Sequence, residues 1–247
     1  MNIQGKATPE FDRMASSFEE LRRDPIHDFF KTSTHFFYER KLSLIEAFFR
    51  SRRRSTASLT WLDVGCGQGD LLRLGAAGFG SVAGCDVSAE MIKGCRDLDV
   101  RLQSDAAVLP FSDHYADFIT AVCVYHHVAP AARQALTAEV HRALKPNGVY
   151  AIIEHNPWNP VTQITVRRSP VDTDAVLLRA GEAASLMKAA GFRLIGRDYF
   201  LYLPQAVYYR VPWVESCMKK IPFGCQYAVF GEKPAGSAAG RSRVTIG

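Results

Sequence analysis

The stretch WLDVGCGQGD, residues 61–70, places three glycines at alternate positions directly after a short apolar run. Glycine adopts positive φ and has no Cβ, so Gly65, Gly67 and Gly69 predict a tight turn in which a ligand lies against bare backbone. In an open α/β sheet, the turn after the first strand lies at the carboxyl edge, where such sheets bind their ligands. The stretch therefore predicts both a fold and a binding site.

Short apolar runs alternate with helical segments along the middle of the chain. Five of them are expected to be strands: TWLDVG at 60–65, SVAGCDV at 81–87, VRLQSDA at 100–106, ADFITAVCV at 116–124 and GVYAIIEH at 148–155. A helical pattern over 180–191 and two strand-like runs at 193–203 and 225–233 follow. This alternation predicts the α/β class, with a Rossmann-like, doubly wound, mostly parallel sheet and crossover helices.

Apolar residues at helical spacing precede the first strand and predict an N-terminal helical cap over residues 1–54. The Rossmann-like domain is expected over 55–234, and the small, polar tail 235–247 is expected to be disordered. Two prolines in EHNPWNP, residues 154–160, predict a rigid exit from the fifth strand into an irregular stretch. We expect that stretch, 157–174, to form a lid over the substrate.

The composition is typical of a globular protein, with 47% hydrophobic and 22% charged residues. The formal net charge of +5 is concentrated in Arg52, Arg53 and Arg54 and in the arginines of the C-terminal tail, which disfavours a nucleic-acid partner. Six separated cysteines without a CxxC pair indicate a reducing, cytoplasmic location. No apolar run is long enough to span a membrane. The oligomeric state is not indicated.

The neighbours of the glycines distinguish a dinucleotide from a nucleoside. A dinucleotide site would place its third glycine at position 70 and a pyrophosphate over the helix that follows. Asp70 stands there, and its charge would repel the pyrophosphate. Asp86 ends the second strand, where a carboxylate accepts from both hydroxyls of a ribose, and Asp105 ends the third, within reach of an adenine amine. The alternative is that each aspartate only caps a helix or turn. Together they favour a nucleoside.

These motifs, followed by CVYHHV and EVHRALKPNGVYAIIE, resemble in order and spacing the class I S-adenosylmethionine-dependent methyltransferases. The resemblance is to the small-molecule type 11 branch, which includes quinone and sterol methylases, and it covers about residues 55–156. It implies an enzyme that transfers a methyl group from S-adenosylmethionine to a small organic acceptor by in-line displacement.

The resemblance also implies the parts of the cofactor that individual residues hold. Asp63 and the glycine turn would pass around the methionine end, Asp86 would hold the ribose, Met91 would lie near the adenine, and Asp105 with the backbone of Ala106 would read the adenine amine. The implied cofactor-binding set is Asp63, Gly65, Cys66, Gly67, Gly69, Asp86, Val87, Met91, Asp105 and Ala106.

The sulfonium already activates the methyl group, so the protein positions the acceptor and removes a proton where one is lost. The candidate proton acceptors lie at the ends of the fourth and fifth strands: Tyr125, His126, Glu154 and His155. His126 is preferred, against the alternative that it packs beneath the cofactor in a structural role. No metal is expected, because adjacent residues of a strand, such as His126 and His127, point to opposite faces.

Aromatic residues in the expected cap and lid and in YFLYLPQAVYYRVPW, residues 199–213, favour an apolar pocket and a hydrophobic or aromatic acceptor. Three alternatives from other classes remain open: a nucleic-acid methyltransferase, a scaffold that binds S-adenosylmethionine without catalysis, and a nicotinamide dehydrogenase. The sequence indicates neither the acceptor nor whether O, N, S or C is methylated.

Overall fold

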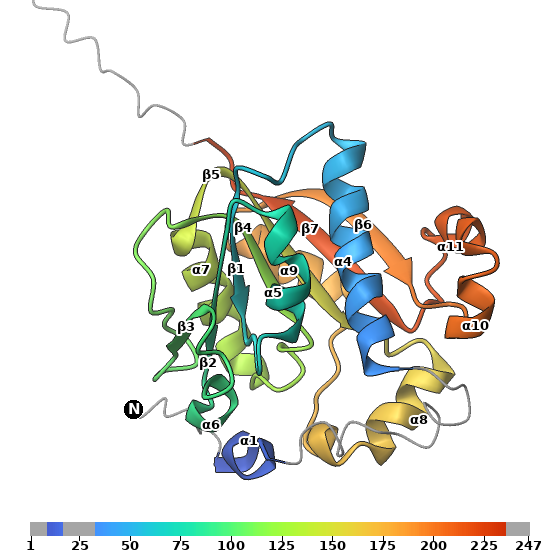
Figure 1. Ribbon diagram of the computed structural model, residues 1–247, viewed down its shortest axis with the longest axis horizontal. Coiled ribbons are helices and arrows are strands. Elements are labelled where there is room, and N and C mark those ends of the chain that lie inside the picture. The colour runs from blue at the N-terminus through green and yellow to red at the C-terminus, as the bar shows by residue number, and fades with distance from the viewer. Residues whose placement is uncertain (1–8, 17–32, 236–247) are drawn as a thin grey trace, which may run out of the picture.

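The computed structural model describes residues 9–16 and 33–235, so residues 236–247 of the predicted C-terminal tail and part of the predicted cap lie outside the described residues. Seven strands form one sheet in the order β3-β2-β1-β4-β5-β7-β6 (Figure 1). They are β1 (Thr60–Val64), β2 (Ser81–Asp86), β3 (Asp99–Leu102), β4 (Ala116–Val122), β5 (Leu144–His155), β6 (Arg193–Phe200) and β7 (Gln226–Glu232). Strands β1 to β5 pair in parallel, and β7 runs antiparallel to both β5 and β6. The predicted fold class and mostly parallel sheet are confirmed.

Helices connect the strands and cover the sheet. The α-helices are α1 (Pro9–Met14), α4 (Thr34–Ser51), α5 (Asp70–Gly75), α6 (Ala89–Ile92), α7 (Arg133–Ala143), α8 (Pro160–Arg168), α9 (Ala180–Ala189), α10 (Gln205–Tyr208) and α11 (Pro212–Met218). Short 3-10 helices are η1 (Ala76–Gly78), η2 (Pro130–Ala132) and η3 (Pro170–Asp172). In the part of the chain that the structure describes, no helix is long and apolar enough to cross a membrane.

The stretch after β5 is not irregular as predicted, because it contains α8 and η3. Asn159 is the N-cap of α8, and its side chain accepts a hydrogen bond from the backbone N–H of Thr162. Pro160 occupies the first turn, where proline is favourable because its position needs no N–H donor. The second proline of EHNPWNP therefore begins a helix, whereas the sequence analysis treated both prolines as parts of a rigid loop.

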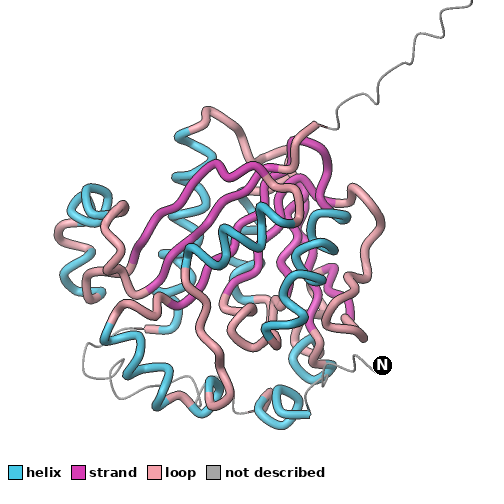
Figure 2. Tube along the Cα trace, turned by 180° about the vertical axis from the view of Figure 1, so that it is seen from behind, coloured by secondary structure: helices cyan, strands magenta, loops and turns pink. Residues whose placement is uncertain are grey.

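Two helical layers sandwich the sheet (Figures 1 and 2). Helices α4 and α5 contribute to the apolar core on one face, and α7 and α9 contribute to the core on the other. Neighbouring residues of a strand point to opposite faces of the sheet. Trp61 belongs to the core on the α4 and α5 face, and Leu62 belongs to the core on the α7 and α9 face. Both are fully buried, which explains why β1 is apolar on both faces.

Helix α4, which the sequence analysis assigned to the cap, packs directly on the sheet. The ring of Phe48 stacks on Phe230 of β7 with centroids 3.9 Å apart, and Phe49 meets Phe118 of β4 edge-on at 5.0 Å. Farther toward its N-terminus, buried Arg40 forms an ion pair with Glu215 of α11. Helix α4 therefore joins the sheet to the helices between β6 and β7.

Helix α1 lies at the edge of the sheet where β1 and β2 end (Figure 1). Its Asp12 Oδ1 accepts hydrogen bonds from Ser88 Oγ at 2.5 Å and from the backbone N–H of Glu90 at 3.2 Å, at the start of α6. The carbonyl of Ala15 accepts from Gln68 Nε2, in the glycine turn, at 3.1 Å. These bonds fix α1 beside the loops that follow the first two strands.

Candidate cofactor and acceptor sites

The glycine turn has the backbone that its sequence predicts. Gly65, Gly67 and Gly69 have φ of +71°, +54° and +79°. A Cβ added at Gly65 would lie 2.5 Å from a methyl carbon of Val124, whereas one added at Gly67 would meet no protein atom within 4 Å. Packing against Val124 therefore explains the glycine at position 65. The bare backbone at Gly67 faces open space that a ligand can occupy.

Asp86 connects this turn to the end of β2. Its Oδ2 accepts from the N–H of Gly67 at 2.8 Å, and its Oδ1 accepts from the N–H of Ser88 at 2.9 Å. Burial raises the pKa of Asp86 above its ordinary value, against the lowering effect of these bonds. Each carboxylate oxygen has a second acceptor position, so both remain able to bind the hydroxyls of a ribose.

Asp63 lies at the end of β1, where it is almost completely buried. Thr120 Oγ1 donates a hydrogen bond to Asp63 Oδ1 at 2.5 Å, and the positive charge of Lys41 of α4 also favours the ionised carboxylate. Burial raises the pKa of Asp63 to about 7 despite both of these interactions. The ionised form of the Asp63 carboxyl would attract a cationic ligand placed beside it.

The remaining residues of the predicted cofactor set follow β1, β2 and β3. Met91 is buried in α6, and Cys66, Val87 and Ala106 are half-buried. Asp105 is exposed, and its Oδ1 accepts from the N–H of Ala107 at 2.8 Å. These residues occupy consecutive loops at the carboxyl edge, where the fold binds nucleosides, and they fit S-adenosylmethionine.

The raised pKa of Asp63 leads to a pH-dependent affinity for S-adenosylmethionine. The cation binds the carboxylate form, so affinity should be highest above pH 7 and should fall as the carboxyl protonates. Between pH 7.5 and pH 6 we expect a loss of about tenfold by calorimetry. Asp63→Asn should bind more weakly and flatten the profile. The same pH profile in wild type and Asp63→Asn would contradict this role.

The four predicted proton acceptors lie in different surroundings. The Tyr125 hydroxyl is buried between Thr137 at 2.7 Å and Tyr150 at 3.0 Å, and burial raises its pKa to about 12. Glu154 is completely buried, accepts from the N–H of Tyr125 at 2.7 Å, and contacts His126. The fourth candidate, His155, is half-buried and lines a cavity.

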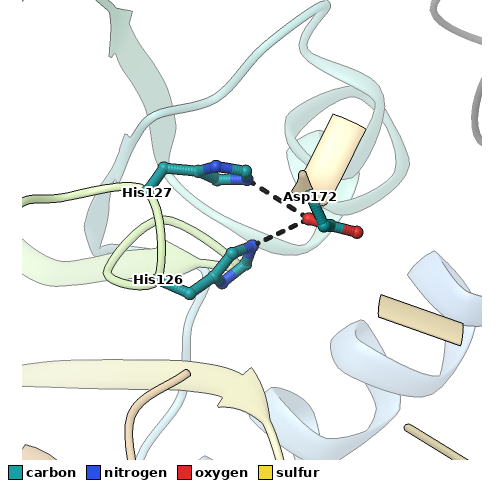
Figure 3. Close-up of side chains that lie close together, drawn as sticks. All are labelled: His126, His127 and Asp172. Atoms are coloured by element: carbon teal, nitrogen blue, oxygen red, sulfur yellow. Dashed lines mark hydrogen bonds and ion pairs between the residues drawn. The ribbon is translucent and has the colours of Figure 1, made fainter. Parts of the chain in front are cut away.

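His126 and His127 both point toward Asp172 of η3 (Figure 3). The prediction that these adjacent histidines point to opposite faces of a strand was wrong, because β4 ends at Val122 and both residues lie in a turn. His126 Nδ1 lies 2.6 Å from Glu154 Oε2, and its Nε2 lies 3.2 Å from Asp172 Oδ1. Burial alone would lower the pKa of His126, but the two carboxylates raise it to about 10.

A cavity of about 240 Å³ lies between the start of α4, helix α8 and the segment 201–205. Its lining is mostly apolar, with Phe36, Phe37 and Leu201 among the contributors, and His155 and Gln226 add polar groups. Gln226 Nε2 contacts Cys123 Sγ, at the end of β4, at 3.6 Å. The cavity wall therefore lies close to the end of β4. Strand β4 pairs with β1, the strand that leads into the glycine turn. A separate hollow of about 560 Å³ lies over β6, away from the glycine turn.

Sequence reasoning missed several residues that build these sites. Asp12 and Gln68 position the loops around the glycine turn through side-chain hydrogen bonds to partners 76 and 53 residues away, which no local sequence pattern signals. Gln103 holds the loop after β3 by donating to the carbonyl of Asp105. Asp172 was missed because its stretch was predicted to be irregular. The proline in the first turn of α8 was the sequence signal that could have predicted a helix in this stretch.

Comparison with known proteins agrees with this arrangement. The type 11 methyltransferase domain model matches residues 62–152. An uncharacterised methyltransferase of Synechocystis is 28% identical over 148 residues, which is 56% of this chain and 69% of that protein. A demethylmenaquinone methyltransferase of Symbiobacterium thermophilum is 35% identical over 105 residues, 38% of this chain and 41% of that protein.

A solved structure supports the same fold. An S-adenosylmethionine-dependent methyltransferase of Thermotoga maritima, described as a possible histamine N-methyltransferase, superposes with a TM-score of 0.64 at 16% identity. The alignment covers 91% of this chain and 98% of that one. Residues 62–152 therefore form a methyltransferase domain, and the described chain has the fold of the S-adenosylmethionine-dependent methyltransferases.

Proposed function

We propose that the acceptor is a small hydrophobic or aromatic molecule bound in the cavity between α4, α8 and segment 201–205. The observation that carries this proposal is the apolar lining at Phe36, Phe37 and Leu201, beside the carboxyl ends of β5 and β4. A volume of about 240 Å³ suits a small acceptor or the reactive ring of a larger one. Polar substrates such as sugars or nucleotides would leave most of their hydrogen-bonding groups unpaired there.

The name of one relative supports the same class. The Symbiobacterium protein is named for a demethylmenaquinone acceptor, which is an aromatic ring system with an apolar tail. Its alignment with this chain is partial, so the support concerns the acceptor class and not the identity of the substrate. The balanced charge of the chain outside its arginine clusters is consistent with a small molecule in preference to nucleic acid.

The proposed residue roles follow the geometry of the two sites. The glycine turn, Asp63, Asp86, Met91 and Asp105 hold the cofactor. When bound, the cofactor supplies the methyl group, whose bond to sulfur breaks as its bond to the acceptor forms, leaving S-adenosylhomocysteine. The imidazole of His155 faces the cavity and takes the proton of an acceptor O–H, N–H or S–H group.

The surrounding elements complete the proposal. Residues 157–174, which contain α8 and η3, act as a lid because Val161, Thr162 and Thr165 line the cavity. The catalytic domain extends over 55–234, and α4 of the expected cap over 1–54 packs on its sheet. All six cysteines are free thiols, which favours the reducing conditions of the cytoplasm.

A ligand screen tests the acceptor class. The full chain, saturated with S-adenosylhomocysteine, would be scanned for thermal shift with a panel of quinones, phenols and lipids and a matched panel of amino acids, sugars and nucleotides. We expect stabilisation from members of the apolar panel alone. Stabilisation confined to the polar panel would overturn the proposal, as would tight RNA or DNA binding that weakens steeply with salt.

Filling the cavity should separate acceptor binding from cofactor binding. Thr165→Trp places an indole in the cavity, so KM for a small apolar acceptor should rise at least about tenfold, the equivalent of about 1.4 kcal/mol. The affinity for S-adenosylmethionine should stay within twofold. Thr173→Trp, at an exposed position of the same lid, is the control and should leave both values unchanged. An unchanged KM in Thr165→Trp would place the acceptor elsewhere.

A further inference from the structure

Three side chains meet where the lid touches the loop after β4 (Figure 3). The Nε2 atom of His126 lies 3.2 Å from Asp172 Oδ1, and the Nε2 atom of His127 lies 3.4 Å from the same oxygen. Among the described residues, these three form a group whose ligand atoms all lie within 4.8 Å of one another. The methyl transfer proposed above uses none of the three.

The local backbone explains how two adjacent histidines converge. His127 N–H donates to Val124 O at 3.0 Å, and Val128 N–H donates to Tyr125 O at 3.2 Å, so the segment forms a tight turn. The two imidazole rings lie with their centroids 4.1 Å apart at an angle of 47°. Both Nε2 atoms therefore face the lid from the same side.

The two histidine nitrogens lie at distances from Asp172 Oδ1 that match those between ligand atoms in a divalent cation site. In a tetrahedral site with metal–ligand bonds of about 2.0–2.1 Å, neighbouring ligand atoms are about 3.3 Å apart. The two separations from Asp172 Oδ1, 3.2 Å and 3.4 Å, are close to that value. A cation would therefore need little rearrangement of these side chains.

Glu154 supplies the outer support that metal-binding histidines usually have. Its Oε2 lies 2.6 Å from Nδ1 of His126, and the N–H of Tyr125 donates to its Oε1 at 2.7 Å. A proton on Nδ1, donated to this buried carboxylate, leaves the lone pair of Nε2 facing Asp172. Glu154 thereby orients His126 as a ligand.

Charge balance gives a second reason for a cation. Glu154 is completely buried and Asp172 is largely buried, so two carboxylates share a region of low solvent access. A divalent ion held between the three ligand atoms would balance both carboxylates and also engage His127.

We propose that His126, His127 and Asp172 bind one divalent cation of the zinc class, with Glu154 positioning His126. Two imidazoles and a carboxylate are borderline ligands that suit Zn²⁺ and related transition ions and disfavour Mg²⁺ and Ca²⁺. Because Asp172 belongs to η3 and the histidines follow β4, the cation ties the lid to the sheet. Three protein ligands leave a fourth coordination position for water or another small ligand.

Cobalt binding tests the site directly. Untagged full-length chain, stripped with a chelator and dialysed, would be titrated with Co²⁺, whose tetrahedral complexes absorb visible light. We expect one Co²⁺ per chain, strong visible bands, and displacement by Zn²⁺ but not by Mg²⁺. Asp172→Asn and His127→Gln should each weaken binding at least about tenfold, as loss of a ligand or its support does. Asp174→Asn and His141→Gln are the controls and should bind as wild type does.

Folding of the variants is checked by their affinity for S-adenosylhomocysteine, which should stay within twofold. Both substituted residues retain some solvent exposure, so these variants avoid the buried position of His126. Failure of the folded wild-type chain to take up one Co²⁺ would overturn the proposal and leave a protonated His126 bridging the two carboxylates. Equal Co²⁺ affinity in wild type and Asp172→Asn would also overturn it. Neither result depends on the acceptor.

Discussion

Replacing Gly67 with alanine should abolish measurable binding of S-adenosylmethionine, with a loss of affinity of at least about 100-fold, or about 2.7 kcal/mol. In the chain itself, a Cβ at this position meets no protein atom within 4 Å, so the added methyl group occupies only the space of the ligand. The substitution also strains the backbone, because Gly67 has φ of +54°. That strain should lower the free energy of unfolding by about 1–2 kcal/mol.

Gly191→Ala provides the matched control, since Gly191 has φ of +94° and lies after α9, outside the cofactor loops. It should lower the melting temperature to a similar degree and leave the affinity unchanged. If Gly67→Ala bound the cofactor as tightly as Gly191→Ala does, the open space at Gly67 would not be the cofactor site.

Asp86→Ala should weaken binding of S-adenosylhomocysteine at least about 100-fold. The carboxylate is expected to accept two hydrogen bonds from the ribose, each worth about 1.5–3 kcal/mol because the acceptor is charged. Part of the effect will be indirect, because Asp86 also accepts from the N–H groups of Gly67 and Ser88. Calorimetry on the variant alone would not separate the two contributions.

A ligand that lacks the ribose hydroxyls separates them. Wild type should bind the 2′,3′-dideoxy analogue of S-adenosylhomocysteine much more weakly than the parent compound, while Asp86→Ala should bind the two about equally. The exposed carboxylate of Asp97 offers the control, and Asp97→Ala should keep the wild-type preference. A variant at Asp86 that still discriminates between the two ligands would show that other groups recognise the ribose.

The sheet and the cofactor loops were predictable because they depend on local sequence. Each of the seven strands overlaps an apolar run of the sequence, and the glycine turn follows from residues that need positive φ. Asp86 was predicted from its place at the end of the second strand, and its side chain lies beside the glycine turn, where it accepts from the N–H of Gly67. These features need no knowledge of distant contacts.

The acceptor side was less predictable because it depends on contacts between distant segments. The cavity is formed by α4, α8 and residues 201–205, which are far apart along the chain, and α10 and α11 were not predicted. His126 and His127 were treated as strand residues, but Cys123 has φ of +57° and the chain turns there. Their common partner, Asp172, is 46 residues from His126, so no local pattern connects them.

Methyl transfer to a small apolar acceptor is tested by incubation with methyl-labelled S-adenosylmethionine and a metabolite extract, with Gly67→Ala as the paired control. We expect wild type to transfer label to a small product that partitions into organic solvent, and Gly67→Ala to give no such product. Label appearing only in water-soluble metabolites or in nucleic acid, or equal labelling by the two proteins, would contradict this expectation.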